Sequence, residues 1–149
     1  MGQGCSREDR GEKAGVVSGF LDTSIVVRYL TGDPPDLAEQ AARIVDRGRD
    51  LKVTDVVLAE TAYVLTSVYR VPREVVVDHL ITLLQKKNIS PFALDKGLAL
   101  QALLLCRPSG RTSFADAMVW AAARSAGSEV VYSLDERFPA DGLEVRQTP

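Results

Sequence analysis

The sequence predicts an α/β fold with a central, mostly parallel sheet of about four to five short strands. Short apolar segments alternate with longer segments whose apolar residues have helical spacing. Clusters of glycine and proline separate the two kinds of segment. In addition, an aspartate follows two of the strand-like segments, Asp22 after 16–21 and Asp135 after 129–134. Strands that alternate with helices normally form a parallel sheet, so these observations together indicate the α/β class.

The first half of the chain predicts two strands, each followed by helices. Segment 16–21 is apolar and is followed by a short helix that ends at the breaker cluster 31–35. Pro35 suits the first turn of the next helix, which stops near Gly48. Thr54 or Asp55 caps the helix after the second strand. The predicted elements are strand 16–21, helix 25–30, a helix from 35 to about 47, strand 51–53 and helix 56–69.

The second half repeats the alternation. Pro72 opens a helix whose apolar residues line one side, and the polar run 86–88 ends it. Ser113 is a good cap for a later helix, which terminates at Gly127. The remaining predicted elements are strand 89–92, helix 94–106, the loop 107–110, helix 114–126, strand 129–134 and a final edge strand 143–145.

Size and composition favour an ordinary globular domain. The chain has 149 residues, and its 46% apolar and 26% charged residues suffice for a core. We expect a flexible tail at 1–15, which is polar and glycine-rich, and one domain at 16–149. The net charge of −2 argues against a broad surface for polyanions, but it is compatible with a nuclease whose acidic site is neutralised by metal.

The cysteines and the hydropathy pattern bear on the compartment. Cys5 and Cys106 have neither the spacing of metal ligands nor that of a disulfide framework, so a reducing cytoplasm is the expected location. The longest uncharged apolar run is far below a membrane span, and we therefore expect no membrane partner.

Four acidic residues are the candidate functional groups. Parallel strands place their carboxyl ends at one edge of a sheet, so Asp22 and Asp135 are expected to be neighbours there. Each could instead serve only as a turn or cap residue. Glu60 has apolar residues three and four positions away on its helix, which predicts that it points toward the core. A glutamate at this position would be explained equally well by a partner arginine or by extension of the Glu60 side chain to water.

Asp116 also has two explanations. It lies three residues after Ser113, in the first helical turn, where a carboxylate stabilises the helix by about 0.3–1 kcal/mol. It also shares a helix face with Val119 and Trp120, which are expected to face the core.

Carboxylates that share a pocket repel one another strongly. Even at an effective dielectric constant near 20, one pair at 4 Å costs about 4 kcal/mol. Their pKa values must therefore rise, or a cation must neutralise them. Oxygen ligands without suitably spaced cysteine or histidine select Mg²⁺ or Mn²⁺, and such sites are typical of phosphoryl transfer.

The chain resembles the PIN-domain ribonucleases of the VapC toxin type. The resemblance is carried by four blocks in order, "FLDTSIVVRYL" at 20–30, "TDVVLAETAYVL" at 54–65, "SFADAMVWAAARSAG" at 113–127 and "VYSLDERF" at 131–138. It implies a three-layer α/β/α fold. It also implies that the catalytic and metal-binding acids are Asp22, Glu60, Asp116 and Asp135, with supporting hydroxyls on Thr23, Ser24 and Ser133. Two departures are the residues that precede the first strand and Ser113, where many relatives have aspartate.

The activity implied by this resemblance is Mg²⁺- or Mn²⁺-dependent hydrolysis of RNA phosphodiester bonds. VapC-like proteins are typically homodimers that bind a small VapB-like antitoxin, so both partners are expected here. Arg28, Arg111 and Arg137 are candidates for contacts with RNA phosphates, because they are basic and two of them lie close to an acid.

Three other functions are compatible with parts of the sequence. A PIN-domain nuclease in RNA processing or quality control would need no antitoxin. A catalytically silent PIN fold could serve as a binding module, although all four acids are present. A phospho-acceptor receiver domain also places an aspartate after a strand, but the lysine that it needs after a late strand is missing.

Overall fold

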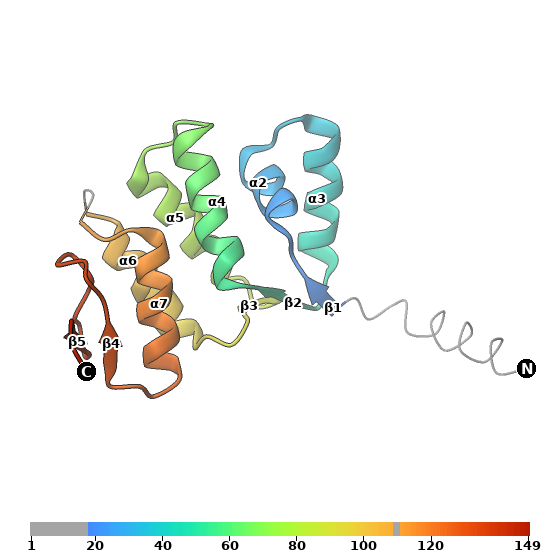
Figure 1. Ribbon diagram of the computed structural model, residues 1–149. Coiled ribbons are helices and arrows are strands. Elements are labelled where there is room, and N and C mark those ends of the chain that lie inside the picture. The colour runs from blue at the N-terminus through green and yellow to red at the C-terminus, as the bar shows by residue number, and fades with distance from the viewer. Residues whose placement is uncertain (1–17, 109–110) are drawn as a thin grey trace, which may run out of the picture.

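The computed structural model describes residues 18–108 and 111–149 (Figure 1). The predicted tail at 1–15, the first two residues of the predicted strand 16–21 and residues 109–110 of the predicted loop 107–110 lie outside the described residues. The rest of the predicted elements are present within a few residues of their expected bounds. In chain order they are β1 (Ser18–Phe20), α2 (Thr23–Thr31), α3 (Pro35–Arg47), β2 (Asp50–Val53), α4 (Asp55–Ser67), α5 (Arg73–Leu84), β3 (Ile89–Pro91), α6 (Lys96–Cys106), α7 (Phe114–Ser125), β4 (Val130–Tyr132) and β5 (Glu144–Arg146).

Local side-chain chemistry sets several of these bounds. Asp22, Thr54, Asp95 and Ser113 each accept a hydrogen bond from a backbone N–H in the first turn of the following helix. Gly32 ends α2 with a φ of 70°, a left-handed conformation that favours glycine. The predicted caps Thr54 and Ser113 and the predicted stop at Gly32 are therefore confirmed.

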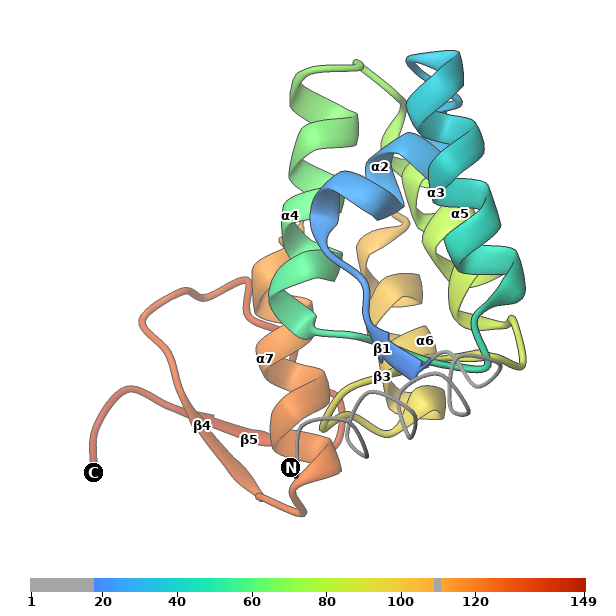
Figure 2. The same cartoon turned by 90° about the vertical axis from the view of Figure 1, so that its right-hand side faces the viewer.

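The first three strands form one parallel sheet in the order β1-β2-β3. Leu51, Val53 and Ile89 are buried on one of its faces. Helices α2, α3, α4 and α5 stand on one side of this sheet in Figure 2. Phe20 and Lys52 share the other face, and Lys52 Nζ donates to Ser90 Oγ at 3.0 Å. The α/β class with parallel strands is confirmed.

The last two strands form a separate parallel pair, β4-β5. The sequence predicted one central sheet of about four to five strands, whereas the structure divides its strands into sheets of three and two. Contacts with α7 explain the position of the pair beside that helix (Figure 1). Trp120 of α7 donates from Nε1 to the carbonyl of Asp141 at 2.9 Å, and Val131 and Phe138 bury their side chains in the core.

One apolar core connects both sheets with the helices. It includes Leu58 and Leu65 of α4, Leu103 of α6 and Trp120 of α7, all of which are almost fully buried. Each helix within the described ranges is too short or too polar to cross a bilayer. The core places α4 at the centre of the molecule, with α2 on one side and α7 on the other (Figure 1).

We expect Cys106 to resist alkylation in the native protein. It is fully buried, and this burial raises the pKa of its thiol from 9.0 to about 11. The folded state thus keeps the proton that the unfolded state releases, so this group destabilises the fold as the pH rises from about 9 to 11. Iodoacetamide at pH 8, followed by peptide mass spectrometry, should leave Cys106 unmodified until denaturant is added. Rapid native labelling would contradict the burial.

Candidate active site

Asp22 lies at the carboxyl end of β1, where the chain turns into α2. Its Oδ2 atom accepts hydrogen bonds from Ser24 Oγ at 2.9 Å and from the Ser24 backbone N–H at 3.4 Å. The hydroxyl of Ser24, helped by backbone N–H groups, lowers the pKa of Asp22 below its ordinary value. The side chain is exposed and ionised at neutral pH, as a metal ligand at this position must be.

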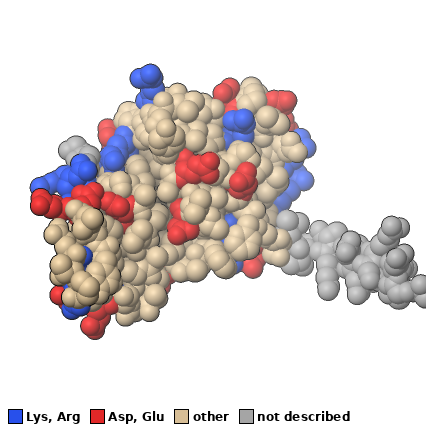
Figure 3. Space-filling model, viewed as in Figure 1, with Lys and Arg blue, Asp and Glu red and all other residues tan. Residues whose placement is uncertain are grey.

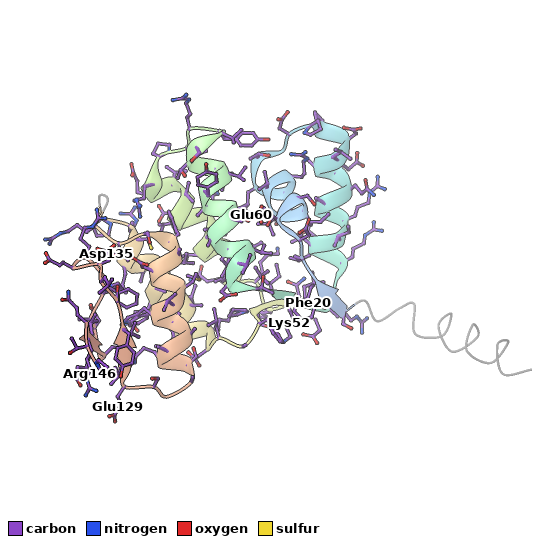
Figure 4. All side chains as sticks on the ribbon, viewed as in Figure 1. Phe20, Lys52, Glu60, Glu129, Asp135 and Arg146 are labelled. Atoms are coloured by element: carbon purple, nitrogen blue, oxygen red, sulfur yellow. The ribbon has the colours of Figure 1, made fainter. Side chains whose placement is uncertain are left out.

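Thr23 connects this strand end to α4. Its Oγ1 atom donates to Glu60 Oε2 at 2.8 Å, which joins the start of α2 to the middle of α4. Thr23 is buried, whereas Glu60 is exposed on the side of α4 that approaches α2 (Figure 4). Acidic side chains gather on the face over α2 and α4 in Figure 3. The structure therefore brings Asp22 and Glu60 to one surface, with the Thr23 hydroxyl bonded to one of them.

The prediction that Glu60 points toward the core is wrong. Two of the four neighbouring apolar residues that suggested it are themselves exposed, Val56 by 66% and Tyr63 by 67%, and the other two are half-buried. The buried face of α4 is formed by Leu58, Ala62 and Leu65 instead. Because α4 is apolar on almost all sides, helical spacing alone does not identify its inward face.

Asp116 lies in the first turn of α7, where its backbone N–H donates to Ser113 Oγ at 3.0 Å. The side chain is half-buried. Helix α7 packs against α4 and α6, and α4 also packs against α2, so α4 lies between α2 and α7 (Figure 1). Ser113 is thus the cap of α7, whereas the capping role of the Asp116 carboxylate itself stays a prediction.

Asp135 lies in a turn beyond β4. Its Oδ1 atom accepts from the backbone N–H of Arg137 at 2.9 Å, and its own N–H donates to Ser133 Oγ at 3.1 Å. The Arg137 backbone N–H lowers the pKa of Asp135. Arg137 also pairs with it through Nε at 3.4 Å. Figure 4 shows Asp135 on the opposite side of the molecule from β1.

The predicted gathering of four carboxylates is absent from this structure. Within 18–108 and 111–149, no three carboxylate, histidine or cysteine side chains lie close enough to hold one metal ion. The prediction assumed that β1 and β4 belong to one sheet, which would place Asp22 and Asp135 side by side. Instead β4 pairs with β5 beside α7, so Asp135 does not lie beside Asp22 at one sheet edge.

The predicted arginines are spread over the molecule. Arg28 is half-buried on α2, Arg111 is exposed just before α7, and Arg137 is paired with Asp135. Sequence reasoning missed Arg73 and Tyr63, which line a cavity between α4 and α7. A signal was available, because Tyr63 lies three residues after Glu60 on one helix.

The residues around Asp22 suit a hard divalent cation. The donors at this surface are the carboxylates of Asp22 and Glu60 and the hydroxyls of Thr23 and Ser24, which are oxygen atoms only. Mg²⁺ is commonly held by one or two carboxylates and keeps several waters, so two exposed acids fit its requirements. This donor set does not suit zinc, which prefers nitrogen and sulfur.

Three comparisons with known proteins show which family the chain belongs to. The crystal structure of Mycobacterium tuberculosis VapC20, a sarcin–ricin loop cleaving toxin, is similar at 24% sequence identity, over 83% of this chain and 95% of that chain, with a TM-score of 0.40. No curated protein matches the sequence significantly. The family model of the PIN domain matches residues 19–141, which include Asp22, Glu60, Asp116 and Asp135. The chain therefore belongs to the PIN domain family.

Proposed function

We propose that this protein is a Mg²⁺- or Mn²⁺-dependent endoribonuclease, and that it is the toxin of a VapBC-type pair. The observation that carries the nuclease proposal is the hydrogen bond between Thr23 and Glu60, which brings Glu60 to the same surface of a PIN domain as Asp22, at the end of β1. The four blocks that resemble VapC toxins support the narrower assignment.

The acids have distinct roles in this proposal. A divalent cation bound there would supply an activated water and stabilise the departing oxygen of an RNA phosphodiester. Asp22 would hold the cation directly, since the Ser24 hydroxyl fixes its carboxylate and keeps it ionised. Glu60 would complete the site, oriented by the hydroxyl of Thr23. Asp116 and Asp135 would add further oxygen ligands.

This role of Asp116 and Asp135 requires a second arrangement of the chain. In the described part of the molecule, β1 pairs only with β2 and β4 pairs only with β5, so each has a free edge. Parallel pairing of these two edges would set Asp22 and Asp135 side by side. Binding of one cation by all four acids would therefore require α7 and the β4-β5 pair to approach β1.

A catalytically silent PIN module is the second candidate function. The separation of the acids in this structure favours it, because two carboxylates hold a cation less firmly than four. A PIN-domain nuclease without an antitoxin is the remaining alternative to the toxin.

The nuclease proposal is tested by incubating the purified protein with total RNA, with and without Mg²⁺ or Mn²⁺, and mapping the new 5′ ends. New ends that need the metal are expected. RNA binding without cleavage at any metal concentration would support the silent module instead.

The toxin assignment needs its own test. Expression of the protein should arrest growth, and co-expression of a small neighbouring gene should relieve the arrest. Cleavage without growth arrest would favour a processing nuclease. The expected homodimer is checked by analytical ultracentrifugation, and the expected cytoplasmic location by cell fractionation.

A further inference from the structure

A cavity of about 500 Å³ lies between α4, the start of α5 and the start of α7. Its wall combines apolar and aromatic side chains with one cation, from Ala59, Tyr63, Phe114 and Arg73. Cavities of this size commonly hold small ligands. Within the described part of the chain, no carboxylate lines this cavity.

The cation in this cavity is held in place. Arg73 donates from Nη1 to the carbonyls of Cys106 and Thr112, both at 2.9 Å. Its guanidinium carbon lies 4.8 Å from the centre of the Phe114 ring, in a cation–π contact. An arginine fixed in this way contributes positive charge and a flat surface at little cost in side-chain entropy.

The aromatic wall is available for stacking. Tyr63 is 67% exposed, and it has the large flat ring on which an unstacked base can lie. Single-stranded RNA is commonly bound in this way, by aromatic rings together with arginine planes. The combination of Tyr63, Phe114 and Arg73 therefore has the chemistry of a base-binding pocket.

The cavity also lies at the correct place for a substrate. Tyr63 is three residues after Glu60, so the two side chains are neighbours on the surface of α4. Glu60 in turn accepts from Thr23, which follows Asp22. A nucleotide whose phosphate is next to Glu60 would thus have its base near Tyr63.

We propose that this cavity takes a nucleobase of single-stranded RNA, stacked on Tyr63 and flanked by Arg73, next to the phosphodiester that the acids hydrolyse. This inference rests on the proposed nuclease function and adds a substrate subsite to it. A subsite of this kind makes RNA binding depend on the base, and not on the phosphate backbone alone.

Binding experiments test the subsite without requiring cleavage. The probes are a fluorescein-labelled RNA oligonucleotide and an abasic ribose-phosphate chain of the same length, with binding measured by fluorescence anisotropy. The wild-type protein should prefer the RNA. Tyr63→Ala should weaken RNA binding about tenfold and leave binding of the abasic chain unchanged, whereas Tyr63→Phe should behave as wild type. Tyr132→Ala is the matched control, because Tyr132 is 63% exposed on the distant β4.

Three results of the binding and sedimentation experiments would overturn the subsite. The first is equal affinity of the wild-type protein for both probes, and the second is unchanged RNA binding by Tyr63→Ala. The third is a dimer that dissociates in sedimentation when Tyr63 is replaced by alanine, because a second copy of the chain would then cover this face. Hydrolysis of bis(p-nitrophenyl) phosphate, which has no nucleobase, separately reports the proposed chemistry. If Tyr63→Ala keeps the rate of this metal-dependent hydrolysis within twofold of wild type, the result supports a subsite distinct from the acids. An equal loss of RNA cleavage and of bis(p-nitrophenyl) phosphate hydrolysis would refute the subsite.

Discussion

Asp22→Asn is expected to lower metal-dependent RNA cleavage by at least about 100-fold, the usual effect of removing one group that stabilises charge in a transition state. The substitution removes a negative charge at the end of β1 and leaves the shape of the side chain unchanged. Asparagine is as good a helix cap as aspartate, so α2 should keep its first turn and the fold its stability. The measurement is the initial rate of cleavage of a labelled RNA at saturating Mn²⁺, together with a thermal melt.

The matched control for this variant is Asp95→Asn. Asp95 caps α6 as Asp22 caps α2, accepting from the backbone N–H of Leu98 at 2.9 Å, but it lies outside the candidate site. It should retain the wild-type rate. Wild-type cleavage by Asp22→Asn would remove this residue from the mechanism, and equal loss in both variants would attribute the effect to helix capping.

The secondary structure could be predicted because its signals are local. Caps such as Thr54 and Ser113 and the stop at Gly32 act within one helical turn, so they are visible in sequence and confirmed in the structure. Parallel strands also followed from their alternation with helices. The fold class could therefore be predicted from short-range patterns and from the general preference of alternating strands and helices for parallel sheets.

The arrangement of the candidate site could be predicted only in part. Asp22 and Thr23 lie at a strand end as expected, because the strand and the following helix are contiguous in sequence. The direction of Glu60 depends on which neighbour covers α4, and α4 has apolar residues on several faces. The place of Asp135 depends on which strand β4 joins. Both are decided by packing between distant segments, which leaves no local signal.

Trp120→Ala is expected to cost about 3–5 kcal/mol of unfolding free energy, the usual loss when a large buried side chain is removed. Trp120 is fully buried in α7, and its ring is covered by Arg124 at 5.4 Å from the ring centre. Both residues donate to the carbonyl of Asp141, Trp120 through Nε1 at 2.9 Å and Arg124 through Nη1 at 3.1 Å. Trp120 and Arg124 therefore hold the segment between β4 and β5 against α7.

Two further variants separate packing from this attachment. Trp120→Phe should cost less than Trp120→Ala, because a ring still fills the core and Arg124 still donates to Asp141. Val119→Ala, at a half-exposed position on the same helix, should change stability by no more than about 0.5 kcal/mol. Urea unfolding is followed by far-ultraviolet circular dichroism, since Trp120 is the only tryptophan. If Trp120→Ala and Val119→Ala are equally stable, α7 does not anchor the segment that carries Asp135. Contacts other than those of α7 would then have to bring this segment toward β1.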